Sequence, residues 1–155
     1  MKANIAIREA LHEDLISVWE IEKSCFAEES FSRRSLAYLI SEANGVFYLA
    51  EYAGEISAYI SLLLNRRYNN ARIYSIAVAP KFRGNGIAEI LMDKVLEFSY
   101  QNQIKSIFLE VSVNNNAAIS LYKKKGFQEH SLKKNYYKDG SDAYSMCLNL
   151  MVNGK

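Results

Sequence analysis

Hydrophobic and polar residues follow two different periods along this chain, and together they predict a mixed α/β fold. Alternating or continuous apolar residues, typical of strands, occur at 4–9, 46–52, 56–64, 73–78, 106–113, 127–132 and 143–151. Apolar residues at three- and four-residue steps, typical of helices, occur at 13–26, 32–43, 87–101 and 114–125. The predicted order of elements is therefore β-α-α-β-β-β-α-β-α-β-β, which gives a central sheet of about seven strands flanked by about four helices.

Polar and glycine-containing segments predict how these elements connect. Residues 27–30 are expected to form a short polar break, and Asn44-Gly45 is expected to end the second helix. The segments 46–64 and 127–151 are predicted to form antiparallel pairs of strands. The two βαβ units after residue 70 are expected to add parallel neighbours to the sheet. The periodicity does not predict the strand order.

Length and composition indicate one domain that spans residues 1–155. Half of the 155 residues are hydrophobic and 23% are charged, which allows a large core and argues against disorder. The net charge of +2 is too small to indicate nucleic acid or a membrane surface as a partner. No stretch approaches the roughly 20 apolar residues of a membrane span, and the N-terminus lacks the apolar core of a signal peptide. We therefore expect a cytoplasmic protein.

The cysteines and histidines are too few and too far apart to predict a disulfide framework or a metal site. Cys25 and Cys147 each lie in an apolar run, and we expect both to be reduced residues of the core. His12 and His130 are isolated in the sequence, so we assign them no metal-binding or catalytic role. We expect the protein to use no metal.

The segment 76–89 is the most informative local pattern, because it combines a strand, a glycine turn and a helix. Pro80 is expected to end the strand, since proline has no N–H to give to a strand ladder. Gly84 and Gly86 lack the Cβ atoms that would keep an anion away from the unpaired N–H groups of the following helix. The alternative is an ordinary turn that needs glycine for a positive φ. The segment lacks both the Lys-Ser/Thr pair of nucleoside-triphosphate loops and the third glycine of dinucleotide loops.

Three motifs give the chain a resemblance to the GNAT acetyltransferases. Arg83-x-x-Gly86-x-Ala88 resembles the acyl-CoA pyrophosphate loop of that family. Residues 108–127 resemble the family's run Leu-Glu-Val … Asn-x-x-Ala-Ile-x-Leu-Tyr-x-x-x-Gly-Phe. Residues 135–146 are similar to a Tyr-Tyr … Asp-Gly … Asp-Ala … Met signature of one branch. That branch acetylates protein N-termini, and it includes the bacterial ribosomal-protein alanine N-acetyltransferases and the archaeal and eukaryotic N-terminal acetyltransferase catalytic subunits. The resemblance covers nearly the whole chain and implies the GNAT fold.

The resemblance implies that the chain binds acetyl-CoA as its cosubstrate. The strand at 76–78 would offer backbone groups to the pantetheine arm in the manner of an added strand. The glycine loop and the start of the helix would bind the pyrophosphate. Asn115 would hydrogen-bond the pantetheine amides, cap its helix, or do both. The implied acetyl-CoA-binding residues are Ile76, Ala77, Val78, Arg83, Gly84, Asn85, Gly86, Ile87, Ala88, Glu89, Asn115 and Tyr122.

The resemblance assigns the chemistry to two residues. Glu110 occupies the position that the family uses as general base, and the Tyr122 phenol could protonate the departing thiolate of CoA. Leu109 and Val111 point to one face of their strand, so Glu110 points to the other, which is either solvent or a cleft. The alternatives are that Glu110 is an ordinary outward strand residue and that Tyr122 only packs on a buried helix face.

The resemblance also implies a protein N-terminal amine as the acceptor. Bacterial relatives often have Pro-Trp-Ser where this chain has Ser30-Phe31-Ser32, so the departure concerns the choice of acceptor. A GNAT acting on a small-molecule amine or a lysine side chain is an alternative, as is a non-catalytic acyl-CoA-binding module. An auxiliary subunit or an association with the ribosome stays open. The tyrosines among the implied acceptor residues could instead pack at a hairpin edge; those residues are Phe26, Glu28, Phe31, Tyr136 and Tyr137.

Overall fold

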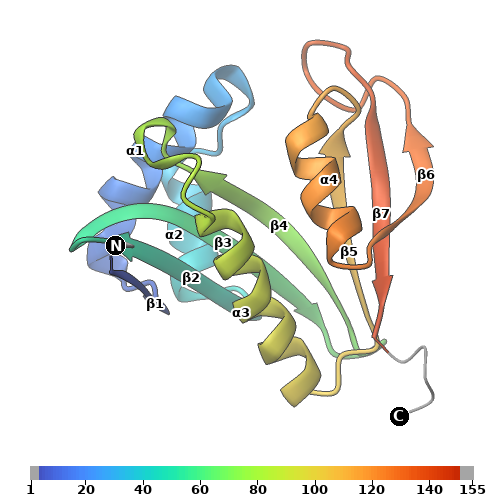
Figure 1. Ribbon diagram of the computed structural model, residues 1–155, viewed down its shortest axis with the longest axis horizontal. Helices are drawn as coiled ribbons and strands as arrows, with labels where there is room; N and C mark the ends of the chain where they lie inside the picture. The colour runs from blue at the N-terminus through green and yellow to red at the C-terminus, as the bar shows by residue number, and fades with distance from the viewer. Residues whose placement is uncertain (1–3, 151–155) are drawn as a thin grey trace. The chain divides into compact units, whose positions relative to one another are not determined.

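Seven strands form one mixed sheet in the computed structural model, which describes residues 4–150 apart from the side chain of Glu28 (Figure 1). The strands are β1 (Ile5–Glu9), β2 (Gly45–Tyr52), β3 (Glu55–Asn65), β4 (Asn70–Val78), β5 (Ser106–Ser112), β6 (Gln128–Lys133) and β7 (Ala143–Asn149). The helices are α1 (Leu15–Phe26), α2 (Arg33–Ser41), α3 (Ile87–Gln101) and α4 (Asn116–Lys124), with short 3-10 turns η1 (His12–Asp14), η2 (Ala27–Glu29) and η3 (Pro80–Phe82). The predicted mixed sheet of seven strands with four helices is confirmed.

Several boundaries differ from the prediction. Residues 27–29 form a 3-10 turn instead of an irregular break, and α2 already ends at Ser41. Gly45 belongs to β2, where a Cβ would lie 1.9 Å from the carbonyl oxygen of Leu62, so glycine is needed for close strand approach and not for a helix end. Strand β4 begins at Asn70, three residues before the predicted apolar run. Residue 151, which was predicted to end the last strand, lies outside the described residues.

Contacts along the chain divide it into two units. The described part of unit 1 comprises residues 4–63 and 73–98, and that of unit 2 comprises residues 64–72 and 99–150.

In unit 1, helices cover both faces of the sheet. Strand β2 pairs antiparallel with both β1 and β3, as predicted for the first hairpin. Helices α1 and α2 pack on one face and α3 on the other (Figure 1). The central residues of β2 and β3 are accordingly buried on both sides. The core beneath α1 and α2 consists of Val18, Ile21, Leu36, Leu39, Phe47, Leu49, Tyr59 and Ala77.

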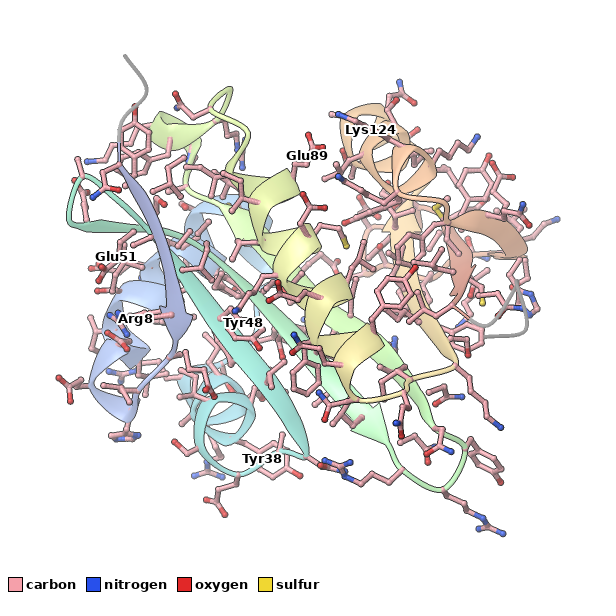
Figure 2. All side chains as sticks on the ribbon, turned by 60° about the horizontal axis from the view of Figure 1, so that its bottom comes forward. Arg8, Tyr38, Tyr48, Glu51, Glu89 and Lys124 are labelled. Carbon is pink, nitrogen blue, oxygen red and sulfur yellow. The ribbon has the colours of Figure 1, made fainter. Side chains whose placement is uncertain are left out.

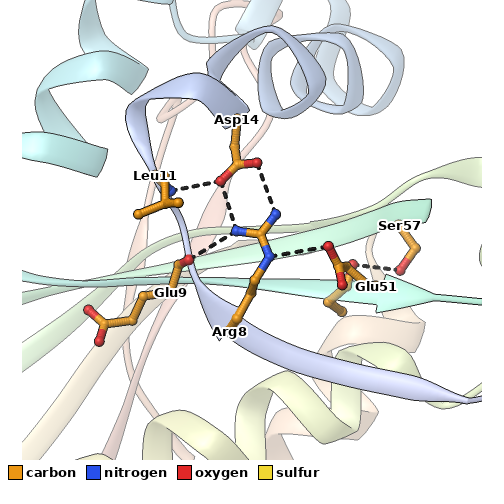
Figure 3. Close-up of polar contacts among 7 residues, drawn as sticks. Arg8, Glu9, Leu11, Asp14, Glu51 and Ser57 are labelled. Atoms are coloured by element: carbon orange, nitrogen blue, oxygen red, sulfur yellow. Dashed lines mark hydrogen bonds and ion pairs between the residues drawn. The ribbon is translucent and has the colours of Figure 1, made fainter. Parts of the chain in front are cut away.

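A charged network attaches the start of α1 to the sheet of unit 1 (Figure 3). Two guanidinium nitrogens of Arg8 donate to the two carboxylate oxygens of Asp14, each at 2.9 Å, and Nε donates to Glu51 at 3.2 Å. The Asp14 carboxylate also accepts the backbone N–H of Leu11 at 2.7 Å. The hydrogen bond from Arg8 holds the pKa of the buried Asp14 carboxyl below its ordinary value. Because Arg8 is on β1 and Glu51 on β2, the network fixes where α1 begins.

In unit 2, the strand order differs from the simple expectation of parallel neighbours. The start of β4 pairs parallel with β5, as predicted for the first βαβ unit. Strand β7, however, lies between β5 and β6 and pairs antiparallel with both. The second βαβ unit therefore adds no parallel neighbour, and that prediction is wrong. A sequence of alternating residues cannot distinguish the two arrangements, because both bury the same face of β5.

Strand β6 is the exposed edge of unit 2, and helix α4 covers the sheet (Figure 1). All six residues of β6 are exposed, and most are polar or charged, which discourages pairing with another chain. Tyr122 of α4 packs against Phe127, with ring centroids 5.9 Å apart. Lys124 lies exposed on the last turn of α4 (Figure 2).

Both cysteines are free and half-buried. Cys25 packs against the core of unit 1, as predicted, although it is not fully buried. Cys25 lies at the end of α1, and Cys147 pairs in register with Gln128 of the exposed edge strand β6. Among the described residues, no helix is long and apolar enough to cross a membrane.

Candidate functional site

The glycine loop of unit 1 has the open backbone that an anion site requires. Gly84 and Gly86 have φ of +85° and +75°, and a Cβ added at either position would meet nothing within 4 Å. The positive φ favours glycine, and the open space leaves the backbone accessible. The N–H of Ile90 donates to the carbonyl of Gly86 at 3.2 Å. This hydrogen bond joins the first turn of α3 to the loop, and the N-terminus of an α-helix is where N–H groups point outward toward a ligand.

Two polar side chains hold this loop. Asn85 Nδ2 donates to the carbonyl of Phe82 at 2.8 Å. Arg83 Nε donates to the carbonyl of Val78 at 3.1 Å, and its Nη2 lies 3.3 Å from the sulfur of Cys25. The Cys25 thiol also donates to the Val78 carbonyl, at 3.3 Å. That carbonyl is therefore engaged inside the chain, which the sequence did not indicate.

The end of β4 belongs to unit 1 and contains the residues that the resemblance assigned to the pantetheine arm. The parallel register with β5 runs from Asn70 to Arg72, at the start of the strand. An exposed strand edge can accept an extended ligand with amide groups. Ile76 and Val78 are half-buried and Ala77 is buried.

A buried carboxylate fixes the segment between α1 and α2. Glu22 is 1% exposed, and its carboxylate accepts the N–H of Phe31 at 2.9 Å and the hydroxyl of Tyr59. The Tyr59 oxygen is also 2.9 Å from Ser75 Oγ, and the Phe31 ring stacks on Tyr74 at 5.1 Å between centroids. Burial raises the pKa of Glu22, although both hydrogen bonds act in the opposite direction. The sequence did not single out this residue, because its one signal is an acidic side chain on the apolar face of α1.

The other implied acceptor residues of unit 1 flank this segment. Phe26 ends α1 and is half-buried against the core of unit 1. The backbone of Glu28 belongs to η2, and its side chain lies outside the described structure. Ala27, between them, has a φ of +47°, which is unusual for a residue other than glycine.

In unit 2, Glu110 lies within a cluster of polar side chains. Its side chain is 10% exposed and contacts polar groups of unit 2. Arg72 donates to Oε1 through Nε at 2.9 Å and also through Nη2. Lys133 donates to Oε2 at 3.3 Å. The same Nη2 of Arg72 donates to the hydroxyl of Tyr136 at 3.1 Å. Glu110 and Tyr136 were among the residues implied by the resemblance, whereas neither Arg72 nor Lys133 was.

The other implied residues of unit 2 lie on α4 and on the connection between β6 and β7. Asn115 caps α4, because its Oδ1 accepts the N–H of Ala118 at 3.2 Å. Tyr122 is only 5% exposed, and burial, helped by the nearby Tyr137, raises the pKa of its phenol. Tyr136 and Tyr137 meet edge to face, with centroids 5.0 Å apart.

The implied site residues thus fall into one group per unit. Unit 1 holds the segment with Phe26 and Phe31, the end of β4, and the glycine loop through Glu89 on the first turn of α3 (Figure 2). Unit 2 brings together Glu110 and Tyr136 through Arg72, and it also carries Asn115, Tyr122 and Tyr137. Within the described residues, no group of three or more His, Cys, Asp or Glu side chains could hold a metal ion.

The chain is similar in sequence and in structure to known acetyltransferases. The family model described as the acetyltransferase (GNAT) family matches residues 9–127, which include parts of both units. A protein of Bacillus subtilis strain 168, provisionally named a ribosomal protein bS18-alanine N-acetyltransferase, is 35% identical over 156 residues, covering 94% of this chain and 96% of that protein. The N-alpha-acetyltransferase of Sulfolobus acidocaldarius is 33% identical over 158 residues, covering 94% and 92%. The crystal structure of the ribosomal-protein-S18-alanine N-acetyltransferase from Escherichia coli superimposes with a TM-score of 0.87 and 26% identity, covering 95% and 94%.

Proposed function

Because this chain belongs to the acetyltransferase (GNAT) family, we propose that it transfers the acetyl group of acetyl-CoA to the N-terminal α-amine of proteins. The observation that carries the proposal is the similarity over 94% of the chain to two proteins named for this acceptor, one bacterial and one archaeal. The two units together would form one catalytic domain, since the family match includes residues of both.

The residues of unit 1 fit a CoA ligand. The open backbone at Gly84 and Gly86 and the N-terminus of α3 suit a pyrophosphate, because free N–H groups and a helix dipole attract anions. The end of β4 suits the amides of a pantetheine arm. Ala79 donates to the carbonyl of Ser57 on β3 at 2.8 Å, so by strand alternation Ala77 also faces β3, and the N–H and C=O groups of Ile76 face the opposite edge, where they would bind the arm. In unit 2, Asn115 caps α4 through Oδ1, and we expect its Nδ2 to donate to a pantetheine carbonyl.

Acetyl-CoA supplies the acetyl thioester, and side chains of unit 2 would accept and donate the protons of the reaction. The neutral form of the acceptor amine bonds through its nitrogen to the carbonyl carbon, and Glu110 takes the proton that this nitrogen loses, directly or through one water. The carbon–sulfur bond breaks with its electron pair leaving on sulfur, and Tyr122 gives its phenolic proton to that thiolate. The products are a neutral amide and the CoA thiol, and the proton on Glu110 returns to the Tyr122 phenolate through water. Burial raises the pKa of Tyr122 above its ordinary value of about 10, so the phenol still holds this proton at neutral pH.

The charge around Glu110 favours an α-amine over a lysine side chain. Arg72 and Lys133 place two positive charges beside one carboxylate, which disfavours a further ammonium. An α-amine has a reference pKa of about 7.7–8.0 and a lysine amine about 10.4, so far more of the α-amine is already neutral at pH 7. The edge-to-face pair Tyr136 and Tyr137 would bind the acceptor backbone. The segment from Phe26 through Glu28 to Phe31 is a second set of residues that we expect to contact the acceptor.

The proposal is tested with peptides that carry both a free N-terminus and an internal lysine. The protein is incubated with acetyl-CoA, and mass spectrometry of fragments locates the acetyl group. We expect it on the α-amine, and we expect the N-formylated form of the same peptide to stay unmodified. Acetyl found mainly on the lysine ε-amine would replace the proposal with lysine acetylation. Tight acetyl-CoA binding without thiol release from any amine would replace it with a binding module.

A further inference from the structure

The cluster around Glu110 contains a cation whose contacts go beyond neutralising that carboxylate. Arg72 lies on β4 and pairs in register with Phe108 of β5, which places its side chain beside Glu110 two residues further along β5. Its Nε and Nη2 both donate to Oε1 of Glu110, and Nη2 also donates to the hydroxyl of Tyr136. We propose that Arg72 is a positioning residue that aligns the catalytic base with the tyrosine that binds the acceptor. This proposal rests on the proposed function, in which Glu110 is the base.

The hydrogen-bonding capacity of Glu110 shows which atom is left for catalysis. An ionised carboxylate has about four lone-pair positions, two on each oxygen. Arg72 occupies both positions on Oε1, and Lys133 occupies one on Oε2. The remaining position on Oε2 is where an amine proton, or the proton of a bridging water, would bind. Arg72 therefore holds the carboxylate by one oxygen and leaves the other to act.

The hydrogen bond from Arg72 orients the hydroxyl of Tyr136. Its oxygen accepts from Arg72 at 3.1 Å, so its own proton points away from the guanidinium. The ring is 40% exposed, which leaves the phenol available to donate to a carbonyl of the acceptor backbone. A single planar group thus sets the distance between the atom that takes the proton and the atom that binds the peptide. Arginine suits this task because its donors form a rigid fork, whereas the donors of lysine share one nitrogen.

The experiment compares steady-state kinetics of Arg72→Lys and Arg72→Gln with the parent, using a short peptide with a free N-terminus. Arg72→Lys keeps the charge but loses the fork. We expect it to lower kcat about 10- to 100-fold and to raise the peptide KM, because small misplacement of reacting groups costs rates of this size. The KM for acetyl-CoA and the melting temperature should stay near the parent values. Arg67→Lys makes the same chemical change on the exposed turn before β4 and should leave all constants unchanged.

A double-mutant cycle separates positioning from general stabilisation. Tyr136→Phe removes the second contact of Arg72 and should raise the peptide KM in the parent. In the Arg72→Gln background the same change should have a smaller effect, because the hydroxyl is no longer aligned. The proposal is overturned if Tyr136→Phe raises the peptide KM by the same factor in the Arg72→Gln background as in the parent. It is also overturned if Arg72→Lys has the kcat and the peptide KM of the parent.

Failure of this proposal is distinguishable from failure of the proposed function. Glu110→Gln measured in the same assay reports on the base itself. If Glu110→Gln is nearly inactive while Arg72→Lys is unchanged, Arg72 has no positioning role although the base assignment stands. If Glu110→Gln is fully active, Glu110 is not the base and the role of Arg72 falls with it.

Discussion

Replacing Gly86 by alanine tests whether the glycine loop binds the cosubstrate. A Cβ at this position would meet nothing within 4 Å, so the substitution causes no clash inside the protein. Its cost to the fold comes from the φ of +75°, which an L-residue adopts with a penalty of about 1–2 kcal/mol. For a chain of this length that corresponds to a melting temperature lower by about 2–8 °C. The protein should therefore remain folded.

The effect on acetyl-CoA should be much larger, because the new methyl group would occupy the space through which an anion reaches the N–H groups of the loop and α3. One hydrogen bond to a charged group contributes about 1.5–3 kcal/mol. Losing one such bond weakens binding about 10- to 150-fold. Gly86→Glu adds a negative charge at the same place and should weaken binding further.

Gly54→Ala is the matched control for this experiment. Gly54 is in the turn between β2 and β3 of the same unit, has a φ of +85°, and also has nothing within 4 Å of an added Cβ. Its loss of stability should equal that of Gly86→Ala, while its affinity for acetyl-CoA should match the parent. Calorimetry measures the affinity and thermal unfolding measures the stability. If both variants bind like the parent, or both weaken equally, the loop is not the pyrophosphate site.

Four further predictions concern single side chains. Glu110→Gln should keep acetyl-CoA affinity and lower kcat by roughly 10²- to 10⁴-fold; a rate within a few-fold of the parent would mean that another group takes the proton. Tyr122→Phe should lower kcat without changing the peptide KM, since the buried phenol would act only on the leaving thiolate, and an unchanged kcat would refute that role. Tyr137→Ala should raise the peptide KM far more than it weakens acetyl-CoA binding; equal effects on both ligands would remove this residue from the acceptor site. Burial raises the pKa of Glu22, so its contribution to stability is present below about pH 4.3, the unfolded value, and is lost as pH rises through the folded pKa. We therefore expect the free energy of unfolding of Glu22→Gln, measured with urea, to rise relative to that of the parent from pH 4 toward neutrality. Glu20→Gln, on the exposed side of α1, is the control. A constant difference between Glu22→Gln and the parent across this range would contradict the prediction.

The glycine loop could be found from the sequence because all its determinants are local. Proline at the end of a strand, two glycines and a helical period follow one another within 76–89, and each acts on its immediate neighbours. The cap of α4 by Asn115 is local in the same way. For this reason the loop and the cap needed no tertiary information.

The polar clusters were missed because their members are far apart in the sequence. Arg72 and Glu110 are separated by 38 residues, Lys133 and Glu110 by 23, and Glu22 and Tyr59 by 37. Periodicity indicated that Glu110 faces away from Leu109 and Val111, but it contains no information on what lies on that face. The buried Glu22 was hidden by a helical pattern that is otherwise apolar.

The sequence by itself therefore determined the kinds and order of the elements, the glycine loop, and the residue types that resemble an acetyltransferase. Only the tertiary structure decided that β7 lies between β5 and β6. It also decided that β4 begins three residues before its apolar run, in a parallel pair with β5, and that Arg72 joins Glu110 to Tyr136. The physical reason is the range of the forces involved. Backbone preferences and burial periods act over a few neighbouring residues, whereas strand order and ion pairs depend on packing the whole chain and leave no local pattern.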